Sequence, residues 1–170
     1  MLLGHLAISA LQHRYLKVDL APAMAAGVFP DVVDKTLCQV LHLTPSGRMF
    51  GHTLLGLALS SVVVGLIGGR KMAWSWAVGY TGHLLGDLGS PIPWFYPFAE
   101  YDFPRPPAGL WEILRNGFSD RREMGIELSL LAWAVFALCW PSIEARLEIT
   151  AEASPCPTAA ASSPENEQAS

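Results

Sequence analysis

Long apolar segments dominate the pattern of this chain and predict membrane-spanning helices. Residues 50–69 contain no Asp, Glu, Lys or Arg, and the segment is as long as the roughly 20 residues that a helix needs to cross a bilayer. Residues 72–88 and 124–140 form a second and a third apolar segment, and Pro141 is expected to end the third. Only the basic pair at 70–71 separates the first two segments, so we expect them to form an antiparallel hairpin.

Two shorter apolar segments precede the hairpin. Residues 1–12 predict an amphipathic helix, because the polar residues, His5 among them, recur on one helical face. Residues 21–28 predict a second short helix that stops at Pro30. Neither segment is long enough to span a bilayer alone, so a packed or re-entrant position is expected.

These elements together predict an all-α fold. We expect a membrane-embedded helical bundle with about three spanning helices and one or two short N-terminal helices. The bundle should occupy residues 1–149. Residues 150–170 contain mostly Ala, Ser, Pro and Glu and no aromatic residue, so they predict a disordered tail. No cleaved signal peptide is expected, because the first residues lack Lys and Arg.

The composition agrees with a small membrane protein. Hydrophobic residues make up 51% of the chain and charged residues only 15%, well below the usual quarter of a soluble domain. The net charge of −4 comes without a basic patch, so nucleic acid is not expected as a partner. The three cysteines show no metal-binding spacing.

The most informative polar residues are His83 and Asp87 in the second apolar segment. They lie four positions apart, so a helix places them on one face. Ionisable side chains in such a setting are costly unless they are paired or metal-bound. Imidazole and carboxylate together suit zinc, manganese or iron. The alternative is a buried His–Asp hydrogen bond that only stabilises the hairpin.

The antiparallel arrangement brings further polar residues to the level of this pair. His52 begins the first span and Glu127 lies in the first turns of the third. His52 could also be an interfacial histidine, and Glu127 could be a ligand, a general base or a partner of Arg48. Asp31 and Asp34 follow the expected helix stop, where Asp is common as a turn or N-cap residue, so that role and metal ligation are equally open.

The position of the site relative to the membrane is partly indicated. The aromatic and proline-rich segment 91–98 suits the headgroup level of a bilayer. The basic pair at 70–71 places the opposite end in the cytoplasm, but more basic residues lie on the side of the site, so either orientation is open. The chain has no HExxH, GxSxG, Walker A or Rossmann motif.

Four short motifs in order resemble a known family. They are Gly4-His5, Phe29-Pro-Asp-Val-Val-Asp34, Gly47-Arg-Met-Phe-Gly-His52 and Gly79-Tyr-Thr-Gly-His-Leu-Leu-Gly-Asp87. This order resembles that of small bacterial inner-membrane proteins described as metal-dependent hydrolases, some of them as LexA-binding. The resemblance covers about residues 1–140 and implies a multi-pass protein of the bacterial inner membrane.

The same order is similar to that of the metal ligands in zinc-dependent phospholipase C and the P1-type nucleases. The resemblance implies phosphoester hydrolysis in an all-helical bundle, with ligands at His5, Asp31, His52, His83 and Asp87. Those enzymes have further histidines, whereas no His follows His83 here. We therefore expect one or two metal ions, most simply zinc, rather than three.

These observations predict a membrane-bound metal-dependent hydrolase of an ester or phosphoester bond. A bound metal would activate water, and Glu127 or Asp34 would accept the proton or orient the ligating imidazoles. The membrane setting and the aromatic segment indicate a lipid or lipid-linked substrate. The alternative is a non-enzymatic membrane protein that uses the same residues for a structural metal or for a partner.

Overall fold

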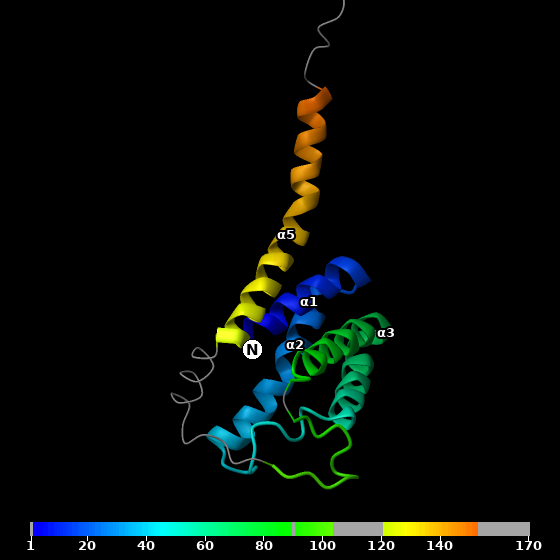
Figure 1. Cartoon of the computed structure of the whole chain (residues 1–170). Coiled ribbons are helices and arrows are strands. Elements are labelled where there is room, and N and C mark those ends of the chain that lie inside the picture. Colours follow the sequence, from blue (N-terminus) through cyan, green and yellow to red (C-terminus); the bar gives the residue numbers. More distant parts are fainter. Residues whose placement is uncertain (1, 90, 104–120, 153–170) are drawn as a thin grey trace, which may run out of the picture. The chain divides into compact units, whose positions relative to one another are not determined.

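The structure, a computed structural model, describes residues 2–89, 91–103 and 121–152, and this part of the chain contains helices and no strands. The predicted all-α fold is confirmed. The elements in chain order are α1 (Leu2–Leu16), α2 (Leu20–Lys35), the π-helix η1 (Thr36–Val40), α3 (Leu54–Gly86) and α5 (Arg121–Glu152). Helices α1, α2 and α3 pack against one another (Figure 1).

Helix α3 contains the predicted hairpin. Its backbone leaves the helical conformation at Gly69, where φ is 77°, a value that only glycine adopts without strain. Beyond this break the second arm returns along the first. The Trp76 Nε1 donates a hydrogen bond of 3.1 Å to the Ser60 hydroxyl, and the Tyr80 hydroxyl lies next to Gly56. The two arms are therefore antiparallel, as predicted, and Figure 1 shows the sharp bend.

Two helices of the described chain, α3 and Met124–Ala145 within α5, are long and apolar enough to cross a membrane. The sequence predicted about three such helices. The difference arises at Gly69, because α3 contains both of the first two predicted spans. Each arm has about 16 residues, so at 1.5 Å per residue it is roughly 24 Å long, somewhat shorter than a hydrocarbon core of about 30 Å.

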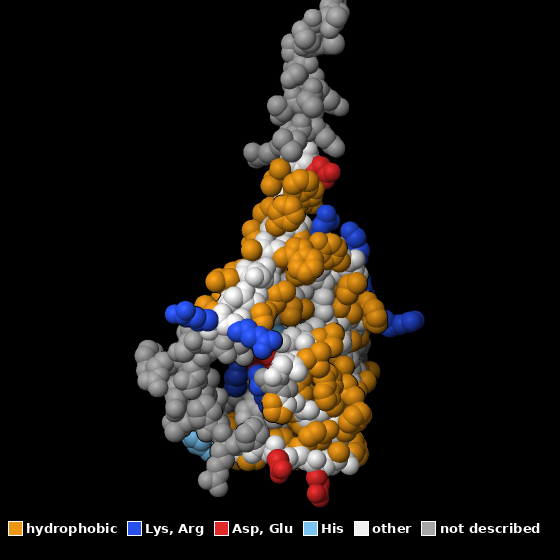
Figure 2. Space-filling view, viewed as in Figure 1, with side chains coloured by type: hydrophobic (Ala, Val, Ile, Leu, Met, Phe, Trp, Pro, Cys, Tyr) orange, Lys and Arg blue, Asp and Glu red, His pale blue; other side chains and the backbone are white. Residues whose placement is uncertain are grey.

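The surfaces of both candidate spans are apolar. Leu66 and Ile67 near the bend of α3 are 83% and 79% exposed, and Phe136 in α5 is 57% exposed. Figure 2 shows hydrophobic side chains over much of the visible face of both helices. Exposed apolar surface on this scale is rare in soluble monomers and suits contact with lipid.

Small residues allow the helices around the site to approach closely. A Cβ atom added at Gly79 of α3 would lie 2.7 Å from the Cα atom of Ala23 in α2. One at Gly82 would overlap the side-chain amide of Gln12 in α1, whose Nε2 donates a hydrogen bond of 2.9 Å to the Val78 carbonyl. Close backbone approach of this kind is typical of helix packing in membranes.

Two expected helix ends are wrong. Helix α2 continues through Pro30 to Lys35, and α5 continues through Pro141 to Glu152. A proline removes one backbone donor from a helix, but packing can hold the helix on both sides of it. Pro30 is buried, and the backbone at Gly51 packs directly against it.

The chain divides into two compact units, residues 1–138 and 139–170. The candidate site residues all belong to the first unit. Helix α5 reaches Glu152, so the first positions of the predicted tail are helical. Residues 153–170 lie outside the described residues, and the domain boundary near residue 149 stays a prediction.

Candidate metal centre

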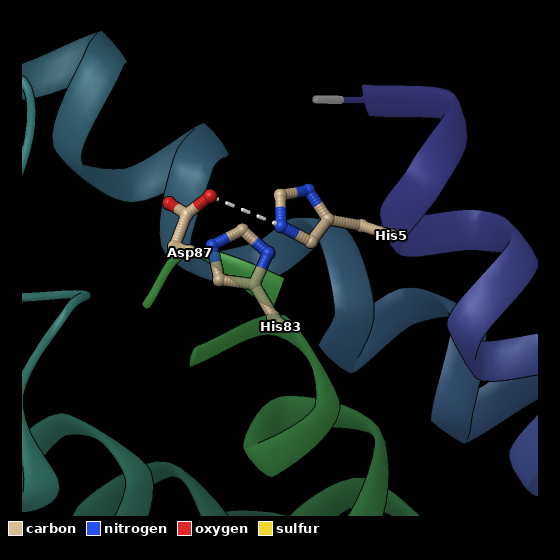
Figure 3. Close-up of side chains that lie close together, drawn as sticks. All are labelled: His5, His83 and Asp87. Carbon is tan, nitrogen blue, oxygen red and sulfur yellow. Dashed lines mark ion pairs between the residues drawn. The ribbon is translucent and has the colours of Figure 1, made fainter. Parts of the chain in front are cut away.

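Five of the predicted site residues converge in the interior of the helical bundle. His5 comes from α1, Asp31 from α2, His52 from the loop before α3, His83 from α3 and Asp87 from its C-terminal cap. All five are at most 6% exposed. Residues 82 positions apart in sequence thus form one polar cluster in an otherwise apolar protein, and part of it is shown in Figure 3.

The hydrogen bonds of His52 and His83 determine which ring nitrogen of each carries the proton. His83 Nδ1 lies 2.7 Å from the Gly27 carbonyl oxygen, and His52 Nδ1 lies 2.8 Å from Asp34 Oδ2. Both oxygens accept hydrogen bonds, so each Nδ1 donates. In the neutral rings the two Nε2 atoms therefore carry no hydrogen. Nevertheless they face each other at 3.2 Å, lone pair toward lone pair.

Two of the distances from His52 Nε2 are close to the ligand–ligand spacing of a tetrahedral zinc site, and a third is longer. Zinc bound at about 2.05 Å by four ligands places these ligands roughly 3.3 Å apart. His52 Nε2 lies 3.2 Å from His83 Nε2, 3.4 Å from Asp87 Oδ2 and 3.7 Å from Asp31 Oδ1. The four atoms are all donors of electron pairs, so a cation between them would relieve their repulsion.

The described residues contain two groups that could hold a metal, and the groups share His83. One is Asp31, His52 and His83, and the other is His5, His83 and Asp87, with ligand atoms in each group within 4.8 Å of one another. In Figure 3 the rings of His5 and His83 lie face to face, with centroids 3.9 Å apart. This arrangement fits the predicted one or two ions.

Several buried polar atoms of the cluster have no hydrogen bond among the described residues. Neither ring nitrogen of His5 has one, although Nε2 lies 3.3 Å from Asp87 Oδ1, and Asp87 Oδ2 has an ion pair with Arg48 but no hydrogen bond. These atoms lie close together, but they are not aligned to form hydrogen bonds with one another. Buried polar groups in this state are costly unless a ligand completes them.

Asp34 has a different environment from Asp31. Its carboxylate accepts hydrogen bonds from the backbone amides of Met49 and Gly51, at 2.7 and 2.8 Å, in addition to the one from His52. The side chain is fully buried in α2. Asp34 therefore fixes both the loop that carries His52 and the tautomer of its ring. The sequence predicted that Asp34 accepts a proton from water or orients a ligating imidazole, and this contact favours the second role.

The alternative that treated Asp31 and Asp34 as turn or cap residues is wrong. Both lie within α2, three positions apart on one face, because the helix does not stop at Pro30. Glu127 lies half-buried in α5, and neither metal-binding group of the described residues includes it. Its role as a general base stays a prediction.

Two basic residues of the cluster were not predicted as parts of the site. Lys35 Nζ lies 2.6 Å from Asp31 Oδ2, and Arg48 Nε lies 3.1 Å from Asp87 Oδ2. Burial raises the pKa of Asp31, but the Lys35 ammonium, together with smaller contributions from His83 and His52, outweighs this effect and holds the pKa below its ordinary value. The signal for Lys35 was its spacing of four from Asp31, which becomes visible only once α2 is known to continue.

One comparison with known proteins identifies a family. The family model described as YdjM inner membrane protein matches residues 1–146. No curated protein and no solved structure matches the chain.

Proposed function

Because this chain belongs to the YdjM inner membrane protein family, we propose that it is a multi-pass protein of the bacterial inner membrane whose His/Asp cluster makes it a metal-dependent hydrolase of ester or phosphoester bonds. The cluster lies at the end of the α3 hairpin, where His52 precedes the first arm and Asp87 caps the second. The candidate metal site and the apolar α3 hairpin are therefore parts of one structural unit.

The observation that carries the proposal is the pair of Nε2 atoms of His52 and His83. When both rings are neutral, the two Nε2 atoms at 3.2 Å, with a carboxylate oxygen beside them, repel one another, and a metal cation among them would relieve this repulsion. A purely structural role of His83 and Asp87 predicts a hydrogen bond between their side chains, and no such bond joins these two described residues. Here Asp34 and the Gly27 carbonyl occupy the other nitrogens, so the ligating side of each ring is left for a metal.

The chain's own residues would perform distinct roles. A divalent ion in this site would polarise the scissile bond and lower the pKa of water. Asp31, His52 and His83 would hold it, and His5 and Asp87 would share His83 to complete the same site or to form a second one. Asp34 would keep the His52 ring in the ligating tautomer. Glu127 remains a candidate for accepting the proton from water.

The surroundings of the site support a lipid or lipid-linked substrate. The Trp94 carbonyl accepts a hydrogen bond of 3.0 Å from the amide of Leu54, two residues after His52, so the aromatic segment 91–98 is anchored beside the site. Phe95 and Phe98 of this segment are 61% and 83% exposed. Exposed aromatic rings are favoured at the headgroup level, where the ester and phosphoester bonds of lipids lie.

The proposal is tested by measuring metal content and hydrolysis on the same purified protein. The protein in detergent micelles is assayed with a chromogenic phosphodiester, a chromogenic carboxyl ester and phospholipids. We expect zinc or another divalent metal to be bound, and hydrolysis of at least one substrate. His83→Ala should lose metal and activity together while the protein still inserts into the membrane.

A matched control is His42→Asn. His42 is exposed, and its positive φ of 53° is tolerated by Asn, so this variant removes an imidazole away from the cluster. It should retain metal and activity. Stoichiometric metal without hydrolysis of any substrate would instead support the non-enzymatic alternative, a structural metal site. Hydrolysis that survives in His83→Ala would refute the proposed site.

A further inference from the structure

Lys35 and Arg48 occupy the outer side of the metal-binding cluster. Their side chains are 43% and 37% exposed, whereas those of their partners Asp31 and Asp87 are 9% and 3% exposed. Each basic group thus lies between a buried carboxylate and the surroundings of the protein.

Both basic groups have donors to spare. Within the part of the chain that the structure describes, the Arg48 side chain makes its ion pair through Nε, and the Lys35 ammonium makes its ion pair with one oxygen of Asp31. A guanidinium has five N–H donors and an ammonium has three. The remaining N–H groups are free to bind a second acceptor without breaking the existing ion pairs.

The charge of the cluster changes sign when a metal binds. Asp31, Asp34 and Asp87 carry three negative charges, and Lys35 and Arg48 carry two positive ones, with neutral histidines. The excess is one negative charge without a metal and one positive charge with a single divalent ion. A loaded site therefore attracts an anion, and the metal also weakens the hold of the carboxylates on the two basic groups.

We propose that Lys35 and Arg48 form an anion subsite that binds the phosphoryl oxygens of the substrate, which makes the substrate a phosphate ester rather than a neutral carboxyl ester. The inference rests on the proposed hydrolase function and specifies its substrate class. The guanidinium of Arg48 offers parallel N–H donors that match two phosphoryl oxygens, and Lys35 adds a point charge. A neutral ester would offer neither group a second anionic partner in addition to its carboxylate.

The test measures two affinities, one for zinc and one for inorganic phosphate with the protein loaded with zinc. Calorimetric titrations are made on the full chain in detergent. Lys35→Met and Arg48→Met should each weaken phosphate binding roughly ten-fold or more, because a charged hydrogen bond is lost. Zinc affinity should stay the same or increase, because each variant removes a cation that competes for a carboxylate.

The directions in which the zinc and phosphate affinities change separate a substrate-binding role of Lys35 and Arg48 from a structural role. If the two residues only hold the carboxylates in place, both variants will bind zinc more weakly and loaded protein will bind phosphate as before, which overturns the proposal. The control is Lys71→Met, which removes the same charge from an ion pair with Asp19 away from the cluster. Its phosphate affinity should remain within about two-fold of the wild type.

Further variants and lipid competition complete the test. Should the Met variants fail to fold, Arg48→Lys keeps the ion pair with Asp87 and should still weaken phosphate binding several-fold, since the planar fork is lost; an unchanged affinity overturns the proposal. Nanodiscs of phosphatidylcholine with phosphatidic acid identify the source of the phosphate. If phosphatidic acid in the nanodiscs competes with free phosphate for the protein, the substrate phosphate belongs to a lipid headgroup. If it does not compete, the phosphate belongs to a soluble phosphate ester. The subsite stands in either case.

The experiments can reject the phosphate subsite and the hydrolase function independently of each other. Phosphate binding that depends on Lys35 and Arg48, without hydrolysis of any substrate, would retain the subsite and remove the enzymatic proposal. Hydrolysis of carboxyl esters alone, with no phosphate binding by the loaded wild type, would retain a hydrolase and remove the phosphate subsite.

Discussion

Replacing Asp34 by Asn should damage the metal site without touching a ligand. The change keeps the size of the side chain but removes its charge and one acceptor. Asp34 Oδ2 accepts from Met49 and His52, and Oδ1 accepts from Gly51. An Asn amide has one acceptor oxygen, so whichever way it is placed, its NH₂ group faces a buried backbone N–H.

The magnitude follows from these three hydrogen bonds. One orphaned buried donor costs about 1–3 kcal/mol of folding stability. Loss of the carboxylate that orients His52 should weaken metal binding by about 10–100-fold, the usual effect of removing such a partner of a ligating histidine. If the NH₂ group faces His52 Nδ1, the ring changes tautomer and Nε2 acquires the proton, which blocks ligation directly.

The assay compares the metal affinity and the melting temperature of the wild type, Asp34→Asn and Asp19→Asn. Asp19 is a suitable control, because its side chain is 43% exposed and pairs with the exposed Lys71. Asp19→Asn should cost less than about 1 kcal/mol and leave metal binding unchanged. An Asp34→Asn protein whose metal affinity lies within two-fold of the wild type would refute the role of Asp34 in orienting His52.

Two further predictions concern packing and pH. Gly79→Ala should destabilise the protein by about 1–3 kcal/mol, because the new Cβ meets the backbone of Ala23, whereas Gly89→Ala, which has open space, should be nearly neutral in the same thermal unfolding assay. Metal affinity should fall as the pH drops from about 7 to 5, because His52 must be unprotonated to bind a metal; burial lowers its pKa, but the hydrogen bonds to Asp34 and Asp87 outweigh burial and raise the pKa above its ordinary value of about 6.5. A metal affinity independent of pH over this range would argue against histidine ligands.

Much of the site could be predicted from the apolar setting of its residues. His83, Asp87 and His52 are conspicuous in segments that otherwise suit a lipid environment, and the short turn at 70–71 fixes the antiparallel arrangement that brings them together. The break at Gly69 confirms that arrangement. What the sequence did not locate was the break itself, which lies at Gly69 rather than at the basic pair 70–71.

The prediction failed where proline was taken as a helix end. Pro30 has no N–H and is unfavourable within a helix, so its local preference alone predicts a stop. Tertiary packing overrides that preference, because Pro30 is buried against the backbone of Gly51. The wrong helix end concealed the helical spacing of Asp31 and Lys35, and with it the basic side of the cluster. Long-range packing of this kind has no signal in a local sequence pattern.

The most direct test of the central claim is the metal content of the purified chain, measured by elemental mass spectrometry after equilibrium dialysis against trace divalent metals. We expect one or two ions per chain in the wild type and less than about a tenth of that in the double variant His52→Ala/His83→Ala, given losses of 10–100-fold even for partners of a ligand. A wild type without stoichiometric metal, or a double variant that keeps it, would contradict the account.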